Sequence, residues 1–342
     1  MTTKTVSGAR RALALILGTA VGLVAVEALA RMFFDVAIQP RFFVDPGYGV
    51  RGVQANIDTR HYVPGDYDVR VTTNSAGMRG QREYAVQKPS GTIRTLVVGD
   101  SMGFGFGVED DEVVSAVLER LLNEQGGSAE RHEVLNQSVS GTGQAEQLVA
   151  FHARFSAYQP DTVVLLYFDN DIGNNSVSGV YEASGDTAVH RTSRSFLPGV
   201  RVQQVLYAAP PIRWLFEHST AWNLIRNQLS SIVQRQLLKT QGLRSYQDGT
   251  PEAIALTRAL IRQFAADAQA IGAQLILVII PARPRMTSNF PMTPEEFAQT
   301  GGLLVDGRDF LTVQDYFVSD SHICASGHAK IAERLKPLIA AH

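Results

Sequence analysis

Short apolar runs alternate with amphipathic segments from Thr92 onward, and this alternation constrains the fold more than any other feature of the sequence. The apolar runs have the length and the largely apolar composition of strands buried on both faces. We predict strands at Thr95–Val98, Glu133–Asn136, Asp161–Phe168 and Leu275–Ile280. We predict helices at Val113–Leu122 with Asp111 as N-cap, Gln144–Tyr158, Pro251–Ile271, and Ala329–Lys336, which Pro337 ends. The alternation implies a parallel sheet covered by helices on both faces.

Two regions interrupt or precede this pattern. Residues 36–90 are rich in Gly, Pro and polar residues, and they contain one alternating strand at Tyr67–Thr73. They hold too little apolar material for a separate core, so we predict a lead-in packed on the main domain. Residues 176–250 form an insertion in the 91–342 domain, with a helix-like stretch from Trp222 to Leu238. We expect the insertion to pack beside the sheet near its ligand-binding edge.

The N-terminus carries an uncharged apolar run from Ala12 to Val26, preceded by Lys4, Arg10 and Arg11. The run is shorter than the roughly 20 residues of a straight membrane span, but continuation to Phe34 gives an adequate length. We predict a signal anchor over residues 1–35, with a cytoplasmic N-terminus and a periplasmic or extracellular catalytic domain. A signal peptide cleaved after Ala30 and a buried core helix are the alternatives.

Charge and cysteine content exclude several classes of protein. The 31 Lys and Arg residues against 33 Asp and Glu residues give a net charge of -2, without the basic excess of a nucleic-acid-binding protein. Cys324 is the single cysteine, which excludes an intramolecular disulfide framework and a multi-cysteine zinc site. We therefore expect no nucleic-acid partner, and no metal or organic cofactor is implied.

The chemistry-bearing residues follow the predicted strands, where ligands bind in an open parallel sheet. Ser101 follows the first strand, and His322 with Asp320 precedes the last helix. His322 can accept the proton of the Ser101 hydroxyl, and Asp320 can orient the imidazole. The backbone N–H groups of Ser101 and Gly141 and the side-chain amide of Asn170 are candidate oxyanion donors. Each residue alone is compatible with a loop or a surface position, but their combination at successive strand ends indicates a serine hydrolase site.

Three other interpretations fit less well. Gly99–Gly103 matches the Gly-x-Ser-x-Gly elbow of α/β-hydrolases, but Ser101 follows the first strand of its domain rather than a later one. A phosphate-binding loop is disfavoured because no Lys-Ser or Lys-Thr follows the glycines. His328 competes with His322 for the role of base, but we place it at the start of the final helix.

The sequence resembles the SGNH (GDSL-type) hydrolase superfamily over about residues 70–175 and 255–342. The resemblance lies in Ser101 within Gly-Asp-Ser, in Gly141, in Asn170, and in His322 with Asp320. It implies a flavodoxin-like three-layer α/β/α fold and an esterase, a lipase, or a carbohydrate O-acetyl esterase or transferase. Departures from the family pattern are Met102 after the serine, Phe168 in the third block, and Asp-x-His in place of Asp-x-x-His.

These observations predict a membrane-anchored serine esterase that removes or transfers a small acyl group, such as acetyl, through an acyl-enzyme. The expected substrate is an acylated small molecule or envelope glycan. Two alternatives remain open from the sequence. The chain could be a non-catalytic glycan-binding or assembly component of the envelope. It could also be an O-acetyltransferase that depends on a multi-span membrane partner as acyl donor.

Overall fold

A parallel sheet forms the centre of the molecule. The computed structural model describes residues 8–39, 42–124, 131–191, 197–240, 242, 244–245 and 249–340. Within these residues the sheet has the order β6-β5-β7-β10-β11, and all its neighbouring strands are parallel. Its strands are β5 (Thr92–Val98), β6 (Arg131–Asn136), β7 (Thr162–Tyr167), β10 (Gln274–Ile279) and β11 (Leu303–Asp306). Counted along the chain this is the order 2-1-3-4-5 of flavodoxin-like folds, so the predicted fold class is confirmed.

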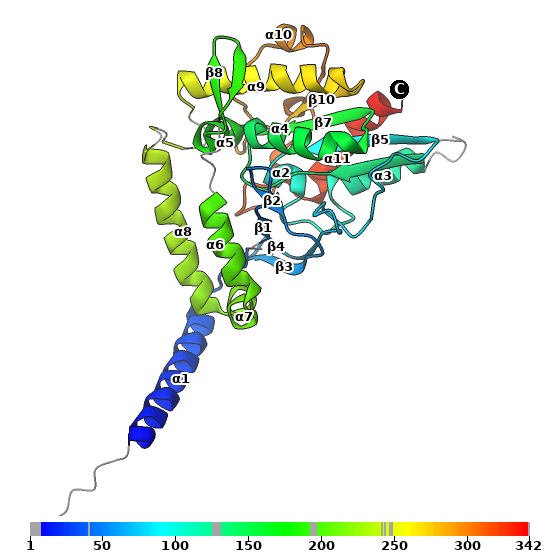
Figure 1. Ribbon diagram of the computed structural model, residues 1–342. Coiled ribbons are helices and arrows are strands. Elements are labelled where there is room, and N and C mark those ends of the chain that lie inside the picture. Colours follow the sequence, from blue (N-terminus) through cyan, green and yellow to red (C-terminus); the bar gives the residue numbers. More distant parts are fainter. Residues whose placement is uncertain are drawn as a thin grey trace, which may run out of the picture.

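Helices cover both faces of the sheet, as its largely apolar strands require. Leu96 and Val98 belong to the core on one face, and Val97 between them belongs to the core on the other. The first face packs on α4 (Gln144–Ala153) and α9 (Pro251–Ala270), and the second on α3 (Val114–Asn123) and α11 (Ala325–Ile339). In Figure 1, α9 lies above the strands of the sheet. Shorter helices are α2 (Ser101–Phe104), α5 (Asn170–Ser178) and α10 (Pro294–Ala298).

The ends of three predicted helices are wrong. Helix α4 ends at Ala153 rather than Tyr158, and a separate 3-10 turn follows at Phe155–Tyr158. Helix α3 begins at Val114 with Val113 as N-cap, so Asp111 lies outside it and caps nothing. Helix α11 begins at Ala325 and runs through Pro337 to Ile339. A proline inside a helix removes one backbone hydrogen bond. Here Leu335 and Ile339 are completely buried, and this packing carries the helix past the proline.

The lead-in consists of two small antiparallel pairs that lie against the sheet domain. Strands β1 (Phe43–Val44) and β2 (Gly52–Val53) form the first pair. Strands β3 (Asp58–Val63) and β4 (Tyr67–Thr72) form the second, which we call the lead-in hairpin. The strand predicted at Tyr67–Thr73 is β4, and its partner β3 had not been predicted.

Helix α1 (Gly8–Phe33) projects away from the rest of the molecule (Figure 1). Among the described residues, α1 is the one helix that is both long enough and apolar enough to cross a membrane, over Arg10–Phe33. None of its most apolar stretch is buried against the rest of the protein. The alternative of a buried core helix is therefore wrong. Residues 1–7, including Lys4, lie outside the described residues.

Three further helices lie between α1 and the sheet domain (Figure 1). They are α6 (Leu197–Ala208), α7 (Pro210–His218) and α8 (Thr220–Thr240). The start of α8 contacts the end of α1, because the Glu27 carboxylate accepts hydrogen bonds from the Ser219 hydroxyl and from the backbone N–H groups of Thr220 and Ala221. A hairpin of β8 (Tyr181–Ser184) and β9 (Thr187–His190) precedes them and packs on α9.

Candidate active site

The candidate nucleophile lies where the chain leaves the sheet. Ser101 is the first residue of α2, three residues after β5 ends at Val98. Asp100 is the N-cap of this helix, and its side chain accepts a hydrogen bond of 2.8 Å from the backbone N–H of Met102. The turn brings α2 close to the loop after β6, where a Cβ atom on Gly103 would lie 2.4 Å from the Ser138 hydroxyl. Glycine at position 103 thus permits the approach that places Ser101 at the sheet edge.

His322 and Asp320 lie beside Ser101 although more than 200 residues separate them in sequence. His322 Nε2 is 2.8 Å from Ser101 Oγ, and His322 Nδ1 is 2.5 Å from Asp320 Oδ1. The backbone N–H of His322 also donates to Asp320 Oδ1 at 3.3 Å, so the two-residue spacing is compatible with the contact. This is the geometry of a Ser-His-Asp triad, with Nδ1–H facing the carboxylate and Nε2 facing the hydroxyl.

The ionisation of Asp320 suits that geometry. Burial raises the pKa of this carboxyl, but hydrogen bonds from His322 and Tyr67 and the charge of His322 outweigh burial, so the pKa lies well below its ordinary value. Asp320 therefore stays ionised throughout the neutral range. An ionised acid in this position stabilises the imidazolium that forms when His322 accepts the serine proton.

His328, the other candidate base, lies elsewhere. It is completely buried in α11, and its Nδ1 accepts a hydrogen bond of 3.2 Å from the backbone N–H of Val114 at the start of α3. Burial lowers the pKa of His328 to about 3, and the positive charges of Arg79 and His322 contribute to the shift. A neutral histidine that links two helices has a structural role, and the structure places His322 rather than His328 against Ser101.

The candidate oxyanion donors come from two further strand ends. Asn170 begins α5 directly after β7, and its Nδ2 donates to Asp100 Oδ2 at 2.8 Å. An amide nitrogen carries two hydrogens, so this bond orients Asn170 and leaves its second N–H for a ligand. Gly141 lies in the loop after β6 with a φ of +70°, and its carbonyl accepts a hydrogen bond from Arg51.

Buried carboxyl groups surround these donors. Burial raises the pKa of Asp100, and the hydrogen bond from Asn170 acts in the opposite direction. Burial also raises the pKa of Asp171 well above its ordinary value, and the charge of Asp100 adds to the effect. Asp171 Oδ2 accepts a bond of 2.6 Å from Gln144. The hydrogen bonds of Asp100 and Asp171 thus hold the start of α5, and with it Asn170, in place.

The lead-in supplies site contacts that sequence reasoning missed. The Tyr67 hydroxyl donates to Asp320 Oδ2 at 2.6 Å, and Arg51 binds both Gly141 and the Glu146 carboxylate. Asp66 accepts hydrogen bonds from the backbone N–H groups of residues 318–320. The alternating pattern indicated a strand at Tyr67, but no local pattern reports a contact across about 250 residues.

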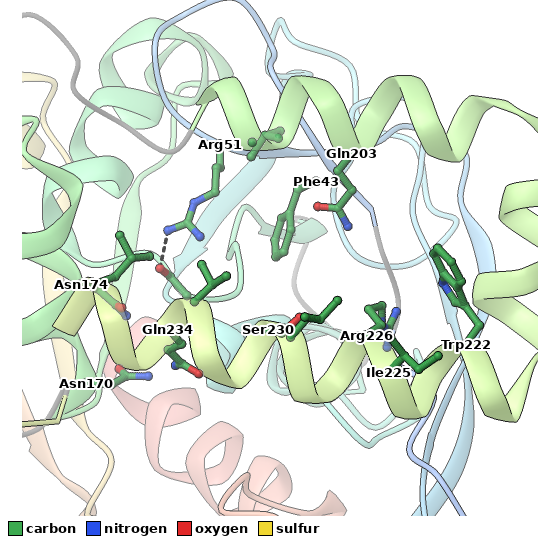
Figure 2. Close-up of a pocket in the computed structure, with 16 residues that line it drawn as sticks. Phe43, Arg51, Asn170, Asn174, Gln203, Trp222, Ile225, Arg226, Ser230 and Gln234 are labelled. Atoms are coloured by element: carbon green, nitrogen blue, oxygen red, sulfur yellow. Dashed lines mark hydrogen bonds between the residues drawn. The ribbon is translucent and has the colours of Figure 1, made fainter. Parts of the chain in front are cut away.

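A cavity of about 970 Å³ opens beside the oxyanion donors. Figure 2 shows it between α6 and α8, with Asn170 and Asn174 at one end, Trp222 at the other and Phe43 between the two helices. Its wall on α8 contains an apolar row made of Trp222, Ile225, Leu229, Val233 and Leu237, with Arg226, Ser230 and Gln234 beside it. Within the described residues, no group of three or more His, Cys, Asp or Glu side chains is arranged to hold a metal ion.

Comparisons with known proteins give similarities in fold alone. No protein-family model matches the chain, and no curated protein does. The chain is similar to the structure of TesA, with 18% identity, 71% of this chain and 96% of that chain covered, and a TM-score of 0.39. It is similar to a putative lipolytic protein of the G-D-S-L family from Desulfitobacterium hafniense DCB-2, with 13% identity, coverages of 72% and 98%, and a TM-score of 0.35.

A third similar structure is a catalytic mutant of Axe2, an acetylxylan esterase from Geobacillus stearothermophilus. The identity is 13%, the coverages are 72% of this chain and 94% of that chain, and the TM-score is 0.41.

Proposed function

We propose that the protein is a serine esterase that works through an acyl-enzyme. The carrying observation is the continuous hydrogen-bonded array from Ser101 Oγ through the His322 imidazole to Asp320. Ser101 Oγ attacks the ester carbonyl while His322 Nε2 takes the hydroxyl proton. The tetrahedral intermediate collapses, the bond to the leaving alcohol breaks, and His322 returns the proton to that alcohol. The acyl group is then bonded to Ser101.

The second half of the reaction regenerates the serine. Water enters, His322 Nε2 accepts one of its protons, and the resulting hydroxide attacks the acyl carbonyl. The tetrahedral intermediate collapses, the bond between Ser101 Oγ and the acyl carbon breaks, and His322 returns the proton to Ser101 Oγ, which releases the carboxylic acid and restores both residues. A sugar hydroxyl in place of water would give acyl transfer with the same proton steps. In both halves, the backbone N–H groups of Ser101 and Gly141 and the second amide N–H of Asn170 are the proposed donors to the oxyanion.

For the substrate, we propose a small acyl group, acetyl first, on a larger carrier such as an envelope glycan or an amphiphile. The cavity that Gly141 and Asn170 border is at the upper end of the size range of small-ligand sites, far more than an acetyl group fills. The carrier alcohol would lie along the α8 wall, with its ester at the end of the cavity formed by Asn170.

We also propose that α1 is retained as a membrane anchor, with the catalytic domain outside the cytoplasm. In support, Glu27 lies before the candidate cleavage point at Ala30 and caps the start of α8 through three hydrogen bonds. Arg31 extends this contact by donating to the His218 carbonyl. A cleaved signal peptide would take the Glu27 cap away. Intact-mass measurement of the protein from membranes tests retention, and a mature start at Arg31 would refute it.

The decisive test of the esterase proposal is Ser101→Ala. We expect turnover of p-nitrophenyl acetate to fall by at least about 10³-fold, because the nucleophile is lost. Ser75→Ala is a matched control, since Ser75 is exposed and its hydroxyl bonds to Glu83 rather than to the triad. Labelling by a fluorophosphonate should likewise require Ser101. Undiminished activity and labelling of Ser101→Ala would refute the proposal.

A further inference from the structure

The turn of the lead-in hairpin meets the loop that carries Asp320. Asp66 lies in the turn between β3 and β4, and Tyr67 is the first residue of β4. The Asp66 carboxylate accepts hydrogen bonds from the backbone N–H groups of Val318, Ser319 and Asp320, at 2.7–2.9 Å for the shortest bond of each. Three consecutive N–H groups bound to one carboxylate fix the path of the loop just before the triad acid.

Tyr67 fixes the carboxylate itself. Its hydroxyl donates to Asp320 Oδ2 at 2.6 Å, while Oδ1 of the same carboxylate faces His322 Nδ1. A phenol has one proton, so the contact of 3.2 Å between the hydroxyl and His61 Nε2 has to be donated by His61. Burial, together with the negative charge of Asp320, raises the pKa of Tyr67, so the hydroxyl remains a neutral donor.

The surroundings of Tyr67 are shaped to bring its ring to this position. The ring packs against Phe317, with 4.6 Å between the ring centroids, and against the buried His61 at 4.8 Å. A Cβ atom on Gly107, which has a φ of +86°, would lie 2.6 Å from the Tyr67 ring. Glycine at the end of the Gly-Phe-Gly-Phe-Gly run after Ser101 thus leaves the space that Tyr67 fills.

We propose that Tyr67 is a positioning residue for the triad: with Asp66, it locks the Asp320 carboxylate so that Oδ1 faces the His322 imidazole. This inference rests on the proposed esterase function and deepens it. Two oxygens of a carboxylate are equivalent until a second donor distinguishes them, and Tyr67 is that donor. Loss of the hydroxyl leaves Asp320 Oδ2 without this donor, so the carboxylate is then held through the two contacts of Oδ1 with His322, and less of its negative charge is neutralised by a hydrogen bond.

The test compares Tyr67→Phe with Tyr62→Phe in the full-length protein. Each change removes one hydroxyl that donates to a carboxylate, but Tyr62 lies on β3 and donates to Asp35, away from the triad. We expect Tyr67→Phe to lower kcat about tenfold, in line with a hydrogen bond to a charged group, with KM unchanged. We expect Tyr62→Phe to match the wild type.

Two further readouts separate positioning from a general loss of structure. The acidic limb of the pH dependence of kcat/KM should move to higher pH in Tyr67→Phe, because the unshared charge of Asp320 stabilises the protonated imidazole more strongly. In an Asp320→Asn background, Tyr67→Phe should cost less than twofold, because the group that Tyr67 positions is already changed. Additive losses in the double variant would overturn the inference.

The activity of Ser101→Ala shows whether a negative result refutes the positioning role of Tyr67 or the esterase proposal itself. If Ser101→Ala is inactive while Tyr67→Phe keeps the wild-type kcat and acidic limb, the positioning role is refuted and the esterase proposal stands. If Ser101→Ala is as active as the wild type, the esterase proposal itself fails. A fall in Tyr67→Phe activity that only parallels a fall in folded protein by circular dichroism also refutes the positioning role.

Discussion

Helices α3 and α8 carry the same kind of apolar row but expose it very differently. In α3, Val114 and Leu118 are completely buried against the sheet. In α8, Leu229 and Val233 are 57% and 58% exposed. The contrast shows that an amphipathic helical pattern alone does not identify a core helix. One row builds the platform that holds the triad, and the other remains available beside the candidate oxyanion donors.

The two helices are also held in place by different forces. Helix α3 packs on α11 and β6 through apolar contacts. The start of α8 is held by polar ones: Glu27 caps it, and the buried Asn223 side chain donates to the carbonyls of Phe216 and Ser219. Exposed apolar rows on folded proteins mark sites of interaction. We therefore expect changes in α3 to affect stability and changes in the α8 row to affect substrate selection.

The largest expected difference is in stability. Leu118→Ala should lower the free energy of unfolding by about 2–5 kcal/mol, because it opens a cavity in the core. Leu229→Ala should change it by less than about 0.5 kcal/mol, because the side chain is largely exposed. Urea unfolding in detergent, followed by circular dichroism, measures both changes. Tryptophan fluorescence is unsuitable because Trp214 lies in α7 and Trp222 in α8, so neither tryptophan lies in the sheet domain. Equal effects of the two substitutions on the free energy of unfolding would contradict the difference in burial between α3 and α8.

The buried core formed by α3 and α11 should also make the stability of the protein depend on pH. Burial lowers the pKa of His328 to about 3, whereas an unfolded histidine titrates near 6.5. Between these values the unfolded chain binds more protons, so this histidine makes stability fall as the pH falls from about 6.5 towards 3.

His328→Gln should make that slope shallower by up to one proton, or about 1.4 kcal/mol per pH unit. Unfolding free energies of the wild type and of His328→Gln, measured between pH 7 and pH 4, give the two slopes. Equal slopes would contradict the assignment of His328 to the buried side.

The smallest expected effect is on substrate selection. Leu229→Asp should lower kcat/KM for decyl acetate about fivefold and leave ethyl acetate unchanged, because a charge replaces part of the apolar wall. Ile232→Asp is the matched control: Ile232 is 55% exposed on the same helix but does not line the cavity. Hydrolysis followed in a pH-stat measures both esters. Equal loss for both esters, or an equal effect of Ile232→Asp, would show that the cavity does not hold the carrier.

Much of the fold could be predicted from the sequence because the central strands are free of charge at most positions. Strand β11 was missed: it has four residues at the sheet edge, and Leu303 is 37% exposed, so its pattern is weak. The end of α11 was misplaced because buried Leu335 and Ile339 outweigh the local preference of Pro337. In both places tertiary packing decided what the local sequence left open.

The candidate site was predictable for a topological reason. Residues that follow parallel strands gather at one sheet edge, so Ser101, Gly141 and Asn170 could be grouped without knowledge of distances. His322 and Asp320 were predicted as the base and its orienting acid, and the structure places both beside Ser101. Tyr67 and Asp66 could not be found this way, because they lie on an antiparallel hairpin outside the sheet and their contacts follow no periodic pattern.

The lead-in hairpin also sets where the proposed esterase acts. Tyr62 in β3 bonds to Asp35 and pairs with Ile38 just after α1, and the same hairpin holds Asp320 through Tyr67. A few rigid contacts, rather than a loose tether, therefore separate the end of the proposed anchor from the triad. Such an enzyme would sample a thin layer at a fixed height above the bilayer, and its substrates would be esters presented at that height.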